Sequence, residues 1–313
     1  MPVRPQDYAF DLERALGAMV ALTTQVPADA LTAETLGTER AGNGVLIRDD
    51  GLVLTIGYLV AEAETIWITL PDGRALPGHL VGYDHETGFG LVQALARLDL
   101  APLPLGDART ARPGERVVVA AAGGLEQALA ARIVARQEFA GYWEYVLDEA
   151  IFTAPAHPSW GGAGLIGPTG ELLGIGSLLV QQMSQDGRTE NRNMFVPIDL
   201  LTPILDELLT LGRRAKPARP WLGLYATEVE DRVVIVSLAR RGPAADADLR
   251  AGDIVLGVGG REVDDLAGLF RAIWAQGEAG AEVPLRIQRD GSTLEVSVRS
   301  ADRRDYFKAP VEH

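Results

Sequence analysis

Short apolar runs separated by turn signals fill the chain from residue 42 to about residue 153. Each run is strand-sized and rich in Val, Ile, Leu or Thr, which favour extended structure. The turns are Asp49-Asp50-Gly51, Pro71-Asp72-Gly73 and Arg112-Pro113-Gly114. We expect strands at residues 44–47, 52–55, 66–70 and 116–121. Many short strands at this spacing predict an all-β sandwich or barrel.

The β pattern resumes after residue 144 and gives way to a helical pattern near residue 201. Strands are expected at residues 145–147, 164–166 and 172–180, and the polar stretch 182–193 is interpreted as an exposed loop. Apolar residues then recur at three- and four-residue spacing, at Leu201, Ile204, Leu205, Leu208 and Leu211. This periodicity predicts one amphipathic helix, with Asp199 capping its start and Gly212 its end.

A second domain is expected after a charged, proline-containing linker. Its strands are predicted at residues 233–237, 254–258, 283–288 and 294–298. One amphipathic helix is predicted over residues 265–274, ending before Gly277. This order is typical of a small α+β domain. The expected organisation is an N-terminal segment (1–41), a first domain (42–212), the linker (213–220), a second domain (221–301) and a C-terminal tail (302–313).

The composition narrows the classes of function. The 313 residues carry a formal net charge of −14, which repels phosphates and argues against a nucleic-acid partner. There is no cysteine, and His79, His85, His157 and His313 are too dispersed to suggest a metal cluster. We therefore expect neither a metal nor another cofactor.

The N-terminal region does not have the pattern of a signal peptide. Its apolar stretch, residues 16–22, is short and follows acidic residues. No apolar run approaches the length of a membrane-spanning helix. These features predict a soluble, cytoplasmic protein without a membrane span. The alternative is a periplasmic protein from which a leader has been removed.

A series of motifs follows a fixed order along the chain. The first are Gly42-Asn43-Gly44-Val45, Leu54-Thr55 and Leu70-Pro71-Asp72-Gly73-Arg74. Further on come Gly170-Glu171-Leu172-Leu173-Gly174-Ile175 and Met194-Phe195-Val196-Pro197-Ile198. Together they resemble the HtrA (Deg) family of trypsin-like serine proteases, from residue 42 to about residue 298. The resemblance implies an all-β trypsin-like double β-barrel followed by a small α+β PDZ domain.

The resemblance also locates the three catalytic positions, and none holds the family's residue. Tyr58 stands at the histidine position in Thr55-Ile56-Gly57-Tyr58-Leu59-Val60, and Gly88 stands at the aspartate position. Gly161 stands at the serine position in His157-Pro158-Ser159-Trp160-Gly161-Gly162. A phenol with a pKa of about 10 and two glycines supply no base, orienting carboxylate or nucleophile.

Other residues near these positions are candidates for a relocated active site. His157 and Ser159 are two residues apart, so they can face the same side of an extended segment, and Ser177 lies on an apolar strand. The alternative is that His157 and Ser159 are turn residues and that Ser177 is a packed hydroxyl.

Four more residues lie near the catalytic positions. For three of them both a functional and a structural role are possible, and for the fourth we expect a space-filling role. Asp84 and His85 form either a relocated acid and base or a solvated turn. Tyr58 is either a space-filling aromatic or a binding residue. Trp160, beside the former nucleophile position, is expected to fill space near the substrate site, leaving the cleft closed or repurposed.

The PDZ resemblance implies a site for peptide C-termini. In PDZ domains a peptide adds as a strand to a sheet edge while backbone N–H groups hold its terminal carboxylate. Trp221, Leu222, Gly223 and Leu224 match the carboxylate-binding loop. One face of the helix with Leu266, Leu269, Phe270 and Ile273 is expected to form the other wall, and each of these residues belongs either to the groove or to the core.

The leading hypothesis is a catalytically inactive HtrA-like pseudoprotease that binds proteins through its PDZ domain. A hydrolase using His157, Ser159 or Ser177 is the alternative, and a structural subunit of a larger assembly is a third interpretation. The family resemblance implies an oligomer, with a trimer or a hetero-complex as possibilities. The alternating Tyr8, Phe10 and Leu12 are candidates for that contact.

Overall fold

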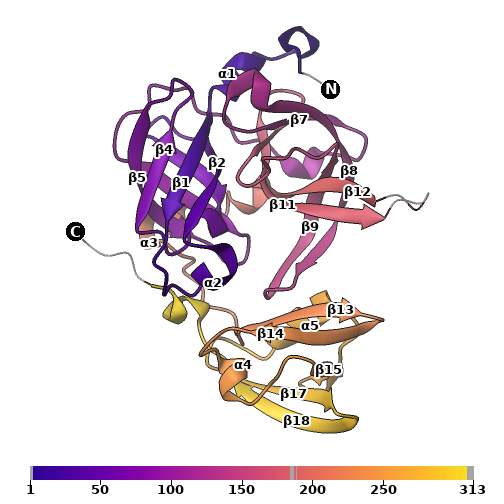
Figure 1. The fold of residues 1–313 in the computed structure, drawn as a ribbon. Coiled ribbons are helices and arrows are strands. Elements are labelled where there is room, and N and C mark those ends of the chain that lie inside the picture. Colours follow the sequence, from indigo (N-terminus) through magenta and orange to yellow (C-terminus); the bar gives the residue numbers. More distant parts are fainter. Residues whose placement is uncertain (1–2, 184–186, 188, 309–313) are drawn as a thin grey trace. The chain divides into compact units, whose positions relative to one another are not determined.

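The computed structural model describes residues 3–183, 187 and 189–308. Contacts divide the chain into two compact units (Figure 1). The first consists mainly of residues up to 137 and residues 149–215. The second combines residues 216–308 with a short distant segment, residues 138–148. That segment is the tip of a hairpin whose base belongs to the first unit.

Two closed β-barrels form the first unit, in the strand orders β1-β2-β3-β6-β5-β4 and β10-β11-β12-β9-β8-β7. The strands of the first barrel are β1 (Met19–Gln25), β2 (Glu39–Leu46), β3 (Leu52–Ile56), β4 (Thr65–Thr69), β5 (Ala75–Tyr83) and β6 (Phe89–Ala94). Those of the second are β7 (Arg116–Ala120), β8 (Ala128–Gly141), β9 (Tyr145–Ala154), β10 (Gly164–Ile166), β11 (Leu172–Met183) and β12 (Thr189–Pro197). Apolar side chains fill both interiors, including the fully buried Phe89 and Phe195. The expected double β-barrel is confirmed.

Short helices connect these strands. The α-helices of the first unit are α1 (Leu12–Leu16), α2 (Ala33–Leu36) and α3 (Leu205–Leu211). The 3₁₀ helices are η1 (Pro5–Asp7), η2 (Gly57–Leu59), η3 (Ala108–Thr110), η4 (Gly124–Gln127) and η5 (Ile198–Leu200). Strand β1 lies within the range that the sequence assigned to an N-terminal segment, and there it pairs with β2 and β4.

The predicted helix near residue 201 is shorter than its periodicity suggested. Residues 198–200 form η5, which contains Asp199, and α3 begins only after Ile204. Pro203 explains the delay because it lacks an N–H and disfavours helical geometry at the residue before it. The prediction of Asp199 as the cap is therefore wrong. Gly212 caps the end of α3 in the left-handed region, with φ 66°, as predicted.

The polar stretch 182–193 is not simply a loop. Strand β11 continues to Met183, and β12 begins at Thr189 and pairs with it, so that Gln181 lies opposite Asn191. A two-stranded extension satisfies its backbone groups through pairing and can present polar side chains to water. Local polarity therefore gave the wrong prediction for these residues. Positions 184–186 and 188 lie outside the described residues.

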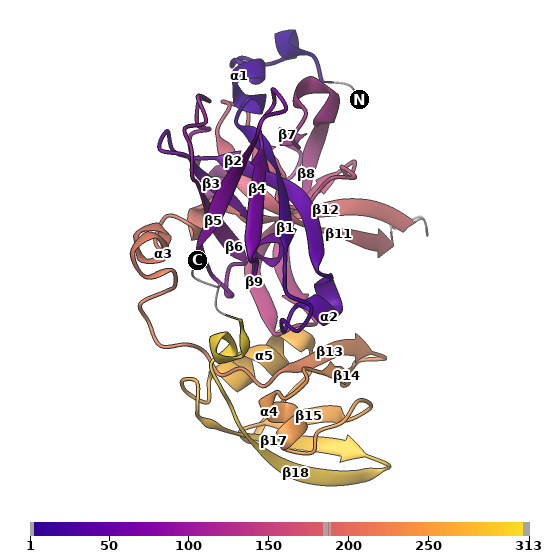
Figure 2. The same ribbon diagram turned by 60° about the vertical axis from the view of Figure 1, so that its left-hand side comes forward.

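The second unit is a small α+β domain, as predicted. Its sheet follows the order β13-β14-β15-β17-β18, and β16 pairs with β15 (Figure 2). The strands are β13 (Leu224–Val229), β14 (Arg232–Leu238), β15 (Ile254–Val258), β16 (Arg261–Glu262), β17 (Glu282–Arg289) and β18 (Ser292–Arg299). The helices are α4 (Pro243–Asp246), α5 (Leu266–Trp274) and η6 (Arg303–Tyr306).

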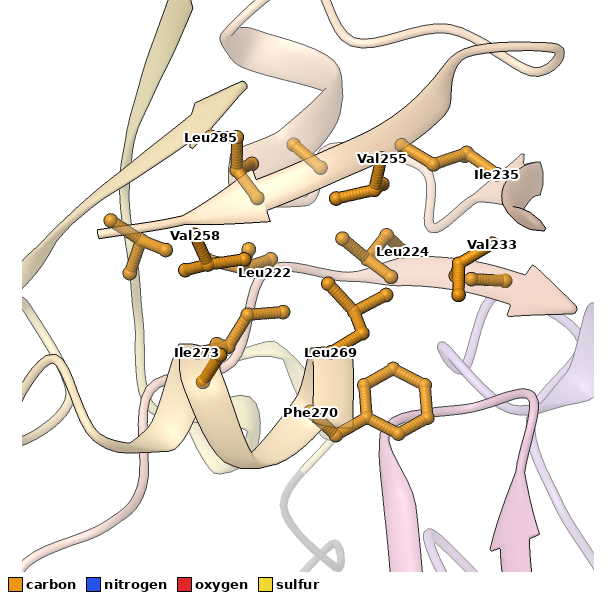
Figure 3. Packing of buried hydrophobic residues seen from close by; sticks show 14 of the residues in the cluster. Leu222, Leu224, Val233, Ile235, Val255, Val258, Leu269, Phe270, Ile273 and Leu285 are labelled. Atoms are coloured by element: carbon orange, nitrogen blue, oxygen red, sulfur yellow. The ribbon is translucent and has the colours of Figure 1, made fainter. Parts of the chain in front are cut away.

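Helix α5 packs on this sheet through the residues that its periodicity marks. The Asp265 side chain caps it, accepting a hydrogen bond of 2.6 Å from the Gly268 N–H. Leu269, Phe270 and Ile273 are fully buried and converge with Leu222 and Leu224 (Figure 3). Leu266 belongs to the same cluster, so all four candidate helix residues contribute to this core.

Candidate functional site

Tyr58, which the resemblance aligns with the family's histidine, bridges the two barrels. It lies in η2 directly after β3, and its hydroxyl donates a 2.8 Å hydrogen bond to the Ser177 carbonyl on β11. Burial raises the pKa of Tyr58 above its usual value. The phenol is therefore a protonated donor at neutral pH, unsuited to accept a proton from a nucleophile.

Gly161, at the serine position, is held by Asn43 of the first barrel. The Asn43 N–H donates to the Gly161 carbonyl at 2.8 Å, and Asn43 Nδ2 donates to the same oxygen at 3.0 Å. Nδ2 also reaches the Ser159 carbonyl at 3.0 Å, while Oδ1 accepts from the Ala122 N–H at 2.9 Å. In the sequence, Asn43 is recognisable only as part of the Gly42-Asn43-Gly44 motif. Its role depends on contacts more than a hundred residues away.

The backbone at Gly88, the aspartate position, is in the left-handed region, with φ 84°. Its carbonyl accepts a 2.6 Å hydrogen bond from the Gly57 N–H, and its N–H donates to the Asp84 carbonyl at 2.8 Å. Glycine adopts this conformation at little cost, whereas most side chains do not. The segment is thus stabilised by backbone contacts where a carboxylate would orient the base.

Asp84 and His85 are not arranged as an acid and base pair. Asp84 is buried and accepts bonds from Arg214 Nε at 2.8 Å and Nη2 at 2.7 Å, and from the Thr87 hydroxyl at 2.6 Å. Burial alone raises its pKa, but Arg214 and Thr87 outweigh burial and lower it. The His85 ring instead packs edge-on against Tyr83, with ring centres 4.4 Å apart. Asp84 is an ionised structural anchor, not a solvated residue.

His157 and Ser159 do come together, but through the main chain. The Ser159 N–H donates a 3.0 Å hydrogen bond to His157 Nδ1, so that nitrogen is already engaged as an acceptor. Asn193 fixes the histidine backbone from both sides, accepting from its N–H at 2.6 Å and donating to its carbonyl at 3.1 Å. Burial lowers the pKa of His157 below its usual value, against opposing bonds with the backbone of Gln127 and Ser159.

This hydrogen bond also affects the place where an oxyanion would bind. In trypsin-like enzymes the oxyanion hole uses the N–H of the nucleophile and that of the residue two positions earlier. Those positions are Gly161 and Ser159 here. Because His157 engages the Ser159 N–H, one of the two donors is not free to stabilise a tetrahedral intermediate.

A cavity of about 670 Å³ adjoins this loop. Its lining includes His157, Pro158, Trp160, Leu179 and Glu190. Trp160 thus contributes to the wall of this cavity. Ser177, on β11, is buried, and its carbonyl is the acceptor for Tyr58.

In the second unit, the predicted loop forms a cluster of backbone donors. The N–H groups of Leu222, Gly223 and Leu224 all donate to the carboxylate of Glu144, at 2.7 to 3.2 Å. Trp221 has a different environment, since its backbone pairs with Ala301 and its ring packs against Tyr306, with centroids 4.8 Å apart. No local pattern in the sequence distinguishes Glu144, so the sequence does not predict this contact.

Comparisons with known proteins agree with this architecture. Residues 42–175 match the trypsin-like peptidase domain model, and residues 220–299 match the PDZ domain model. The structure resembles that of an HtrA-type protease, AlgW with a tripeptide, with a TM-score of 0.54, 21% identity and coverage of 93% of this chain and 95% of that one. The chain therefore consists of a trypsin-like peptidase domain followed by a PDZ domain.

Curated relatives define the family more closely. A probable periplasmic serine endoprotease DegP-like of Halomonas elongata is 29% identical over 85% of this chain and 57% of its own length. The serine endoprotease DegS of Salmonella typhimurium is 26% identical over 94% of this chain and 85% of its own length. The chain is thus similar to HtrA-family proteases over most of its length. It spans about half the length of the DegP-like relatives that it matches.

The same comparison corrects the expected location. The DegP-like relatives from Halomonas elongata and Pseudomonas fluorescens are named periplasmic, so the prediction of a cytoplasmic protein is wrong. The prediction had relied on the absence of a signal-peptide pattern, which does not report where a mature chain resides. Among the described residues, no helix has both the length and the apolar character needed to cross a membrane.

Proposed function

We propose that this chain is a catalytically inactive HtrA-family protein that binds protein C-termini through its PDZ domain. One observation carries the proposal: Tyr58, Gly88 and Gly161 stand where the family has its base, orienting acid and nucleophile. The matching motifs on either side of each position support this register. Without these groups, acyl transfer lacks both the attacking oxygen and the proton acceptor.

Four contacts support the same proposal. The Tyr58 hydroxyl donates to the Ser177 carbonyl, and Arg214 and the Thr87 hydroxyl donate to the Asp84 carboxylate. His157 is committed to the Ser159 N–H. Asp84 and His157, two of the candidates for a relocated acid or base, are therefore engaged in holding the scaffold.

The proposal is tested with the purified full chain, a fluorophosphonate probe and unfolded casein. We expect neither covalent labelling nor casein cleavage, while an active HtrA protease assayed in parallel gives both. Labelling that disappears in Ser159→Ala or Ser177→Ala would instead establish a hydrolase with a relocated nucleophile. A labelled peptide with a free C-terminus tests the binding part of the proposal.

We further propose that the chain acts as an oligomer, in line with the family resemblance. Tyr8 and Phe10 form an edge-on pair with ring centres 5.5 Å apart, whereas Leu12 is buried within its own chain. Only the two aromatic residues remain candidates for a contact between copies. Static light scattering at micromolar concentration tests this, and a monomeric mass would refute it.

A further inference from the structure

The tip of the β8–β9 hairpin places a carboxylate in the PDZ loop. Glu144 Oε1 accepts from the N–H groups of Gly223 at 2.7 Å, Leu224 at 3.1 Å and Leu222 at 3.2 Å. Oε2 accepts from the Leu222 N–H at 3.1 Å. Glu144 is buried, with only 8% of its surface exposed. This set of donors is the one with which a PDZ domain holds the carboxylate of a peptide.

The loop is built to present these donors. Gly223 adopts φ 75°, and its carbonyl accepts a 2.7 Å bond from the Ala239 N–H. The Leu222 carbonyl accepts a 2.8 Å bond from the Ala244 N–H. With the carbonyls satisfied on the domain's own side, successive N–H groups turn toward one point and form an anion-binding concavity.

The rest of the hairpin tip follows the course of a bound peptide. The Ala226 N–H on β13 donates a 3.0 Å hydrogen bond to the Tyr142 carbonyl, as it would to an added strand. The rings of Tyr142 and Tyr225 lie 5.9 Å apart. Val146 is buried in the apolar cluster that contains Leu222, Leu224 and Phe270. Carboxylate, backbone and apolar side chain thus each have a counterpart in the groove.

Charged contacts secure both flanks of the tip. Arg271, on α5, forms ion pairs with Glu138 before the turn and Asp148 after it. Glu144 itself has φ 60°, a left-handed conformation that a glutamate adopts at a cost. Its contacts with the loop offset that cost. The turn conformation and the docked carboxylate therefore depend on each other.

We propose that the hairpin tip, residues 138–148, is a built-in ligand of the PDZ groove, with Glu144 standing in for a C-terminal carboxylate. A peptide with a free C-terminus and an apolar last residue binds only by displacing it. This inference rests on the proposed peptide-binding function. Because only the undocked fraction of molecules can bind, the apparent affinity is the intrinsic affinity multiplied by that fraction.

The test uses the full chain and two release variants, Glu144→Ala and Glu144→Lys. The matched control is Glu149→Ala, because Glu149 lies in the same hairpin but pairs with Arg136 at 2.7 Å. Two readouts are measured: hydrogen exchange at the amides of Leu222, Gly223 and Leu224, and fluorescence anisotropy of a labelled peptide ending in valine. The peptide's C-terminal amide serves as the carboxylate control.

We expect loop amide exchange to accelerate in both release variants, and peptide affinity to rise by about tenfold or more, since the variants remove the hydrogen bonds that compete with the peptide for the same loop. Glu149→Ala should match the wild type in both readouts, and the amide peptide should bind weakly throughout. Unchanged loop exchange in the release variants would overturn the inference, even if the wild type binds peptide. Accelerated exchange without peptide binding in any variant would uphold docking while refuting the proposed peptide-binding function.

Discussion

A Cβ atom at Gly161 would lie 2.9 Å from the hydroxyl oxygen of Tyr58, closer than such atoms normally approach. The residue at the histidine position therefore occupies space that a side chain at the nucleophile position would need. Under the proposed alignment the two positions are therefore linked, because a side chain at position 161 requires the Tyr58 hydroxyl to shift.

Restoring the nucleophile alone should not restore activity. Gly161→Ser supplies an oxygen without a base, and in serine proteases losing one essential triad member costs on the order of 10⁶ in turnover. We expect no fluorophosphonate labelling. The added Cβ should also displace Tyr58 from the Ser177 carbonyl, costing about 1 kcal/mol of unfolding free energy. Urea unfolding measures this, with Gly161→Ala as the steric control; rapid labelling of the serine variant would contradict the proposed inactivity.

The ion pair between Asp84 and Arg214 should stabilise the first unit. Arg214→Met leaves a buried carboxylate without its main partner and should cost about 3 kcal/mol in urea unfolding. Arg213→Met is the matched control, because Arg213 is exposed and its guanidinium donates to a backbone carbonyl. Equal stability of the two variants would show that the pair is dispensable.

The same pair predicts an acid dependence. The folded state lowers the pKa of Asp84 below 3.8, so the stabilisation is fully present above that value and is lost as pH falls through the folded pKa. The difference in unfolding free energy between wild type and Arg214→Met should therefore shrink at acidic pH. A constant difference down to about pH 2 would contradict this assignment.

His157 should make the fold sensitive to mild acid. Because burial lowers its pKa below 6.5 in the folded state, the unfolded chain takes up a proton first as pH falls. The contribution of neutral His157 to the free energy of unfolding is then fully present above pH 6.5 and declines below it. His157→Gln retains an acceptor for the Ser159 N–H but does not titrate, so it should lose less stability between about pH 7.5 and about pH 5.5. Parallel pH profiles of the two proteins would be evidence against the role assigned to His157.

The stabilisation that docked Glu144 provides should change with pH in the opposite direction from the stabilisation that the Asp84 ion pair provides. Burial raises its pKa to about 7 from an ordinary 4.5, against the loop N–H groups and the nearby charge of Arg303, which lower it. The docked form thus takes up a proton, so its stabilisation is fully present below 4.5 and is lost as pH rises through about 7.

At about pH 8, the amides of Leu222, Gly223 and Leu224 should therefore exchange faster in wild type than in Glu144→Gln. At about pH 5, the difference between the exchange rates of the two proteins should be smaller. The glutamine keeps the shape of the protonated carboxyl and does not titrate. The ion pairs of Arg271 with Glu138 and Asp148 are present in both proteins and cancel in the comparison. If the ratio of the loop-amide exchange rates in wild type and Glu144→Gln did not change with pH, Glu144 would not control docking.

The sequence by itself determined the β-rich architecture of two domains. Short apolar runs and turn residues are local signals, so β10 and β15 were predicted to the residue. Gly212 was recognisable as a helix cap for the same reason. The alignment of Tyr58, Gly88 and Gly161 with the family's catalytic positions stays a prediction from the motifs around them.

The tertiary structure decided which groups meet. Asn43 reaches Gly161 across 118 positions, Arg214 reaches Asp84 across 130, and Glu144 reaches Gly223 across 79. Contacts between residues so far apart in the sequence depend on how the whole barrels and the PDZ sheet fold, so local periodicity carries no trace of them. Whether the PDZ groove is open or occupied therefore depends on the tertiary structure, although the residues of its loop could be predicted from the sequence.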